Sequence, residues 1–261
     1  MFNIPREFEL ILKDFSYSTY QNFLSIFLNS SRNLCFRDFS QENLKEEFFL
    51  LRHDVDFSPE AALNMAELEA NMGIKATYFI LFSSPHYNLF DNEHILFPRK
   101  LSQLGHEVGL HYDLKVFETF NNKSPLEILE IQSETLSTLA GAEVKSIAMH
   151  NPSLSGDDLF RETKFLNAYS DQFTRKISYF SDSCGAWRDE FVNHIENQNI
   201  PPQMQLLIHP FFWGPTSLNR WETLDLFIKN KEKSLFNECK FIQEIWRNHP
   251  GVIAHDKRKN V

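Results

Sequence analysis

Short apolar runs alternate with helical segments from residue 48 to residue 215, and this alternation restricts the fold more than any other feature. The runs are rich in β-branched and aromatic residues, and seven of them begin near residues 48, 74, 106, 144, 166, 176 and 204. Strands that alternate with helices in this way form a parallel sheet. We therefore predict an α/β fold whose sheet closes into a (β/α) barrel. A doubly wound open sheet is the alternative.

Helical patterns separate and flank these runs. Ser58 and Pro59 are typical of a helix start, and Gly73 is typical of a helix end. Periodicity and end signals predict helices over residues 6–29, 58–73, 92–105, 124–141, 188–198 and 216–248. No linker or low-complexity segment divides the chain, so we predict a single domain over residues 1–261.

Composition argues against several classes of protein. The formal net charge is −9, and the only basic cluster is a terminal "DKRKN", so we expect no nucleic-acid partner. The three cysteines are far apart and indicate neither a disulfide framework nor a cysteine-rich zinc site. No apolar stretch reaches the ~18 residues of a membrane span, and the N-terminus lacks a signal-peptide pattern. We therefore expect a cytoplasmic protein.

Five of the apolar runs end in histidine or aspartate. The residues at these ends are Asp54 and Asp56, His111 and Asp113, His150, Asp182, and His209. In β/α folds the carboxyl ends of the strands share one edge, where active sites are found. A lone histidine after a strand is more often a loop or core residue. Five such endings on one edge favour a catalytic or metal site.

Asp54 and Asp56 lie two residues apart, so in a strand they point to the same side, and His53 points away. Two crowded carboxylates repel unless a cation lies between them or one is protonated. The simplest alternative is that Arg52 or Arg188 pairs with them.

A carboxylate and a histidine suit a divalent metal with an open position for water, whose pKa then falls to about 7. The other carboxylate can act as a general base and a second histidine as a general acid, which indicates hydrolysis. The chain has no G-x-S-x-G, P-loop or G-x-G-x-x-G motif.

Six motifs in order resemble those of the polysaccharide deacetylase superfamily, also called the NodB-homology domain, over about residues 48–215. They are "RHDVD", "KATYFI", "GHEVGLHYD", "MHNPS", "SDSCGAW" and "LLIHP". The resemblance implies a distorted, typically seven-stranded (β/α) barrel, here with extra N- and C-terminal helices. It also implies a hydrolase that removes N-acetyl groups from sugars with a divalent metal, for which we expect zinc.

The resemblance assigns roles to residues at the strand ends. Asp54 matches the catalytic base, and His209 matches the acid that protonates the leaving amine. Asp182 lies in the segment that tunes that histidine. Asp56 and His111 match two metal ligands.

Three further residues, Trp187, Arg188 and His150, are assigned to the substrate site, with ordinary packing as the alternative for Trp187. The family's second metal histidine follows the first by four residues, but this chain has Lys115 there. An ammonium group has no lone pair for a metal. The metal therefore uses Asp113 or His150 instead, binds weakly, or is absent.

Three functions are consistent with these patterns. The leading hypothesis is a hydrolase that removes an N-acyl group, acetyl or formyl, from a sugar or glycoconjugate precursor. The second is a hydrolase of an amide that is not a sugar. The third is a carbohydrate-binding or regulatory protein that has lost efficient catalysis. Lys115 in place of a metal histidine is the feature that suggests it.

Overall fold

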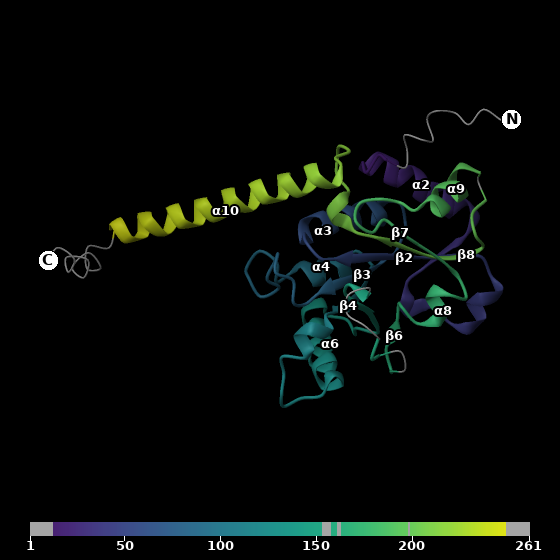
Figure 1. Cartoon of the computed structure of the whole chain (residues 1–261), viewed down its shortest axis with the longest axis horizontal. Helices are drawn as coiled ribbons and strands as arrows, with labels where there is room; N and C mark the ends of the chain where they lie inside the picture. The colour runs from purple at the N-terminus through teal and green to yellow at the C-terminus, as the bar shows by residue number, and fades with distance from the viewer. Residues whose placement is uncertain (1–12, 153–157, 161–162, 198, 249–261) are drawn as a thin grey trace. The chain divides into compact units, whose positions relative to one another are not determined.

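Two units make up the chain, Met1–Leu218 and Asn219–Val261, and each is described by itself. The computed structural model describes residues 13–152, 158–160, 163–197 and 199–248 of the 261 (Figure 1). Every described strand lies in the first unit, and the described part of the second unit contains one long helix.

A parallel sheet forms the centre of the first unit. Its strands are β1 (Arg32–Leu34), β2 (Phe48–Val55), β3 (Thr77–Leu81), β4 (Glu107–Tyr112), β5 (Ser146–Met149), β6 (Leu166–Asn167), β7 (Ser178–Ser181) and β8 (Gln203–Ile208). Seven of them follow the spatial order β6-β5-β4-β3-β2-β8-β7, and each neighbouring pair is parallel. The short strand β1 pairs with the start of β2 outside this order, and the sequence did not predict it.

The strand order is that of a barrel opened at one seam. Taken as a circle, it runs along the chain from β2 to β8 and returns to β2. Among the described residues no pairing joins β6 to β7, so the seam lies there. The sheet curls, and helices surround it (Figure 1). A doubly wound sheet would instead reverse its order at an internal switch point. The predicted distorted, seven-stranded (β/α) barrel is therefore confirmed.

Alternate residues of β2 face opposite sides of the sheet, and this positions the site. Leu50 packs in the smaller core cluster inside the barrel, whereas Leu51 packs in the larger cluster beneath the helices. Arg52 and Asp54 continue the inner row because side chains alternate along a strand. His53 faces outward and hydrogen-bonds to Glu69 of the next helix, as the alternation predicts.

One helix of the first unit precedes the strands, and the others lie between them. The helices are α2 (Tyr17–Ser30), α3 (Pro59–Asn71), α4 (Phe97–Gln103), α5 (Leu114–Phe117), α6 (Pro125–Ala140), α8 (Asp171–Thr174) and α9 (Asp189–Glu196), with 3-10 turns η1 (Phe36–Asp38), η2 (Gln41–Lys45) and η3 (Pro210–Phe212). Side-chain caps lie at the starts of α2, α3, α5 and α6. The Ser58 hydroxyl accepts from the Ala61 amide at the start of α3, and Ser124 and Glu127 form a capping box on α6.

Several predicted boundaries were wrong, for local reasons. Helix α2 begins at Tyr17 because Ser16 caps it; of the predicted 6–29 helix, residues 6–12 lie outside the described residues. Helix α4 begins well after residue 92 because the Asp91 carboxylate accepts from two following amides and holds a turn instead.

The described part of the second unit contains helix α10 (Arg220–Asn248), which begins four residues later than predicted (Figure 1). Asn219 explains the later start, because its side-chain oxygen accepts from the amides of Trp221 and Glu222. None of the helices in the described part of the chain is long and apolar enough to cross a membrane.

Candidate active site

The carboxyl ends of β2, β4, β5, β7 and β8 carry most of the residues that the sequence assigned to a site. These are Asp54 and Asp56 on and after β2, His111 on β4, His150 after β5, Asp182 after β7 and His209 after β8. Parallel strands end at the same edge, so the five segments supply side chains to one region. Their contacts divide them into three groups: a carboxylate–arginine pair, a candidate metal group and a carboxylate–histidine pair.

Arg52 pairs with Asp54 inside the barrel. Its Nε donates to Asp54 Oδ1 at 2.8 Å and its Nη2 donates to Oδ2 at 2.7 Å, and both side chains are buried. Gln205 accepts from Nη1 at 3.2 Å, and the guanidinium lies 4.4 Å from the centre of the Tyr169 ring. Burial alone would raise the pKa of Asp54, but the charge and hydrogen bonds of Arg52, together with the charges of His111 and His209, outweigh burial and lower that pKa. Asp54 is therefore ionised at neutral pH.

His111 lies between a backbone carbonyl and two carboxylates. Its Nδ1 is 2.9 Å from the Ala148 carbonyl oxygen, which can only accept, so Nδ1 carries a proton. Its Nε2 lies 3.3 Å from Asp56 Oδ1 and 3.5 Å from Asp54 Oδ2. Burial opposes a charge on the ring, but the two carboxylates outweigh burial and raise the pKa of His111. Either a proton on Nε2 or a metal ion satisfies these carboxylates.

Three residues could hold a metal ion together: Asp56, His111 and His150. One ligand atom from each lies within 4.8 Å of the others, close enough for a single ion to contact all three. Asp56 Oδ1 is buried and accepts no hydrogen bond of regular geometry from the described residues. Nδ1 of His111 is occupied by a carbonyl, which directs the Nε2 lone pair of the neutral ring toward the group. The donor set therefore fits a divalent ion.

His150, and not Lys115, lies near the other two candidate metal ligands. Lys115 is exposed in the first turn of α5, and its amide donates to the Asp113 carboxylate, which caps that helix. The other oxygen of Asp113 lies 3.4 Å from His150 Nδ1. A carboxylate behind a histidine orients the ring of a metal ligand. Of the two replacements that the sequence left open, His150 lies in the candidate metal group and Asp113 contacts His150.

His209 and Asp182 form the third group. His209 Nδ1 donates to Asp182 Oδ1 at 2.7 Å, and the His209 amide donates to the same carboxylate at 3.0 Å. The Trp213 indole donates to Oδ2 at 2.9 Å. Burial alone would lower the pKa of His209, but Asp182, with more distant help from Asp56 and Asp54, raises it to about 9. His209 therefore carries a proton at neutral pH and can donate it from Nε2.

Within the described residues, Trp187 and Arg188 form no hydrogen bond or ion pair with these three groups. Trp187 stacks on Phe191 with ring centres 4.2 Å apart and meets the edge of Trp213 at 6.4 Å, which is the packing role that the sequence left open. Arg188 is exposed before α9, and in the described part of the chain it forms no ion pair with Asp54 or Asp56. Their assignment to the substrate site stays a prediction.

Sequence reasoning missed three residues that hold the site in place: Gln205, Tyr169 and Trp213. Gln205 carried a signal, since it is an amide with apolar neighbours on both sides within β8. A buried polar side chain needs a partner, and here Gln205 accepts from Arg52 and donates to two backbone carbonyls. The two aromatic residues carried no signal that separates them from core residues.

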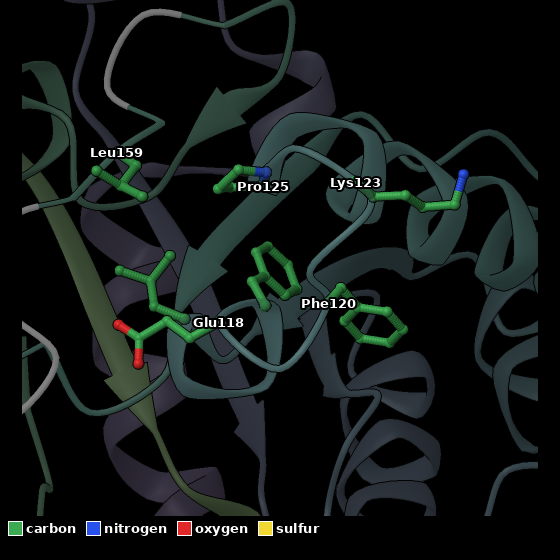
Figure 2. A pocket seen from close by; sticks show the side chains of 7 residues that line it. Glu118, Phe120, Lys123, Pro125 and Leu159 are labelled. Carbon is green, nitrogen blue, oxygen red and sulfur yellow. The ribbon is translucent and has the colours of Figure 1, made fainter.

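A cavity of about 400 Å³ lies beside α5 and the start of α6 (Figure 2). Its lining is mostly apolar: Leu114, Phe117, Glu118, Phe120, Lys123, Pro125 and Leu159. Leu114 follows Asp113 directly, so one wall of the cavity begins next to the residue that supports His150. This volume lies within the usual range for small-molecule sites.

Comparison with known proteins finds similar solved structures. The chain matches no protein-family model, and no curated protein matches it. Among solved structures, a CE4 family pseudoenzyme from Bacillus anthracis is 18% identical, with a TM-score of 0.43 over 72% of this chain and 62% of that one. This chain thus spans less than two thirds of that protein's length.

Two other similar structures are named as enzymes. A family 4 carbohydrate esterase from Bacillus anthracis is 16% identical, with a TM-score of 0.42 over 82% of this chain and 86% of that one. A polysaccharide deacetylase from Bacillus cereus is 15% identical, with a TM-score of 0.42 over 72% and 89% of the two chains. These are proteins of the class that the sequence motifs resemble. Identities and TM-scores this low do not establish a shared activity.

Proposed function

We propose that this protein hydrolyses an N-acyl group, acetyl or formyl, from a sugar or glycoconjugate precursor. The observation that carries the proposal is the ligand group Asp56, His111 and His150, in which His111 Nε2 also lies 3.5 Å from Asp54. The motifs suggest the class of reaction, and the contacts at the strand ends suggest which residues perform it.

The proposed metal ligands are Asp56, His111 and His150, with zinc as the expected ion. Two imidazoles and one carboxylate are a common donor set for catalytic zinc, which keeps a further position open. Such an ion supplies Lewis acidity, which polarises the acyl oxygen and makes a neighbouring water more acidic. His150 is the proposed source of the imidazole that Lys115 cannot supply, and its place in the candidate group supports an enzyme over a protein that has lost catalysis.

Asp54 is the proposed base and His209 the proposed acid. Asp54 is held ionised by Arg52 and takes a proton from water as the water oxygen bonds to the acyl carbon. His209, held protonated by Asp182, gives its Nε2 proton to the amide nitrogen as the carbon–nitrogen bond breaks. The products are a free amine and a carboxylic acid, which loses its remaining proton to water at neutral pH. The proton held by Asp54 then passes through water to His209 before the next turnover. The surroundings lower the pKa of Asp54 and raise the pKa of His209. Asp54 is therefore suited to accept a proton and His209 to donate one.

The part of the substrate beyond the reacting amide is proposed to enter the cavity beside α5. Phe120 and Phe117 offer aromatic faces there, and Glu118 and Lys123 offer polar groups to hydroxyls. Aromatic rings with a few polar groups suit a sugar, which has apolar ring faces and polar edges.

The proposal is tested with a panel of N-acetyl and N-formyl sugars and nucleotide-linked sugars beside small linear and cyclic amides. We expect zinc-loaded protein to release acetate or formate from at least one sugar, and Asp54→Asn to abolish release without loss of the folded state. Turnover of small amides alone would favour the second function. Sugar binding in calorimetry without any product would favour a binding protein.

A further inference from the structure

Helix α10 presents apolar side chains at a seven-residue interval. Trp221, Ile228, Leu235 and Ile242 recur with this spacing, and none of the described residues of the helix is buried. Trp221 is 69% exposed and Leu235 is 62% exposed. A strict seven-residue repeat of apolar side chains is the pattern by which two helices coil around each other.

A second row lies three residues after the first. Its members are Leu224, Lys231, Glu238 and Ile245. The two rows form one stripe along the helix because residues three and four apart lie on the same face. The ends of the stripe are apolar in both rows, whereas its middle contains one positive and one negative charge, Lys231 and Glu238.

We propose that this stripe pairs with the α10 stripe of a second copy of the chain, in antiparallel orientation. In a parallel pair each residue faces its own copy, so Lys231 would face Lys231 and Glu238 would face Glu238. Like charges within a helix seam disfavour pairing. An antiparallel pair brings opposite charges together, and the charge pattern of the stripe therefore selects the orientation.

One antiparallel register uses the whole stripe. It pairs Trp221 with Ile245, Leu224 with Ile242, Ile228 with Glu238, and Lys231 with Leu235. In this register Lys231 of one copy lies one helical turn from Glu238 of the other, and symmetry repeats this contact. Both ends of the pair are then purely apolar, and a two-fold axis relates the copies. Long helices with an exposed apolar face are rarely stable alone in water.

The mass of the full-length protein, measured by light scattering and sedimentation over a range of concentrations, tests the pairing. We expect a dimer, and we expect Leu235→Asp to make it a monomer. Phe236→Asp is the matched control, since Phe236 is equally exposed but lies on another face of the helix. Circular dichroism and the melting temperature of the first unit confirm that each variant folds.

Charge reversal tests the orientation. In the antiparallel pair Lys231→Glu and Glu238→Lys each place like charges together, and we expect each to weaken dimerisation about tenfold. The double swap restores it, and Lys240→Glu on the outer face leaves it unchanged. In a parallel pair each single swap would replace one like-charge contact with another, so dimerisation would not weaken.

Three results would overturn the proposal. The first is a monomer at every concentration with α10 protected from hydrogen exchange, because the helix would then pack on its own chain. The second is a monomer whose α10 binds vesicles of anionic lipid. The third is a dimer that the single charge swaps do not weaken.

Discussion

Arg52 and Asp54, two residues apart on β2, form a buried pair in which the guanidinium contacts both carboxylate oxygens, at 2.8 and 2.7 Å. Both continue the row of inward-facing side chains on β2 that starts with Phe48 and Leu50. Without Arg52, Asp54 would be a buried and unpaired carboxylate. The contact therefore helps to keep Asp54 ionised, and we expect it to stabilise the barrel.

The variant Arg52→Gln tests this relationship. It leaves the Asp54 carboxylate buried without its cation, so we expect a loss of about 3–5 kcal/mol in the free energy of unfolding. Urea unfolding measures the loss. Asp54→Asn in the same chain should recover part of it, because the uncompensated charge is then gone. Arg32→Gln, which removes only the exposed pair with Glu46, is the control and should change little.

His150, and not Lys115, is expected to complete the metal group. We predict that His150→Ala weakens zinc or cobalt binding at least 100-fold, whereas Lys115→Ala leaves it unchanged. Competition with a chelating dye gives the affinities. Asp113→Asn should have an intermediate effect, since Asp113 lies behind the His150 ring. Equal losses in the lysine and histidine variants would contradict this assignment.

Asp182 is expected to set the protonation of His209. The raised pKa of His209, about 9, means that the protonated ring is favoured in the folded state. Its contribution to stability is full below the unfolded pKa of about 6.5 and is lost as pH rises through about 9. Asp182→Asn should lower this pKa, and proton NMR of the imidazole in metal-free protein measures it.

The same variant should move the alkaline limb of the pH–rate profile to lower pH, because His209 must be protonated to donate. Trp213→Phe removes only one donor to Asp182 and keeps the carboxylate, so it should shift the limb less. An alkaline limb that stays in place in Asp182→Asn would exclude His209 as the acid.

Phe120 is expected to contact substrate without taking part in the reaction. Phe120→Ala should raise KM several-fold and leave kcat nearly unchanged, because the interaction is the same in the ground state and the transition state. Phe90→Ala is a matched control, since Phe90 is also an exposed phenylalanine but does not line the cavity. A fall in kcat with unchanged KM would contradict a role for Phe120 in substrate binding alone.

The parts of this fold that depend on local pattern could be predicted from sequence. The apolar runs of β2 to β8, the caps of α3 and α6, and the outward direction of His53 all follow from periodicity and end signals. The seam between β6 and β7 could not, because it depends on pairing between segments far apart in the chain. Strand β1 was missed since three residues carry too little periodicity.

The site was predictable where one strand supplied the residues. The spacing of Asp54 and Asp56 placed them on one side, and Arg52 shares that row. Across strands the sequence was less specific: it left Asp113 and His150 open as replacement ligands beside Asp56, and it gave no sign that Trp213 contacts Asp182. The position four residues after His111 holds Lys115, which cannot bind a metal, and only the three-dimensional positions of the residues after β4 and β5 show that His150 lies beside Asp56 and His111.

The most direct test of the central claim is the dependence of acyl release on metal content. Protein stripped with a chelator is titrated with zinc while acetate or formate release from the best N-acyl sugar is followed, beside elemental analysis of the same samples. We predict that activity rises linearly and saturates at one ion per chain, and that His111→Ala neither binds the ion nor releases product. Release by the fully stripped protein at the same rate would contradict a metal-assisted hydrolase.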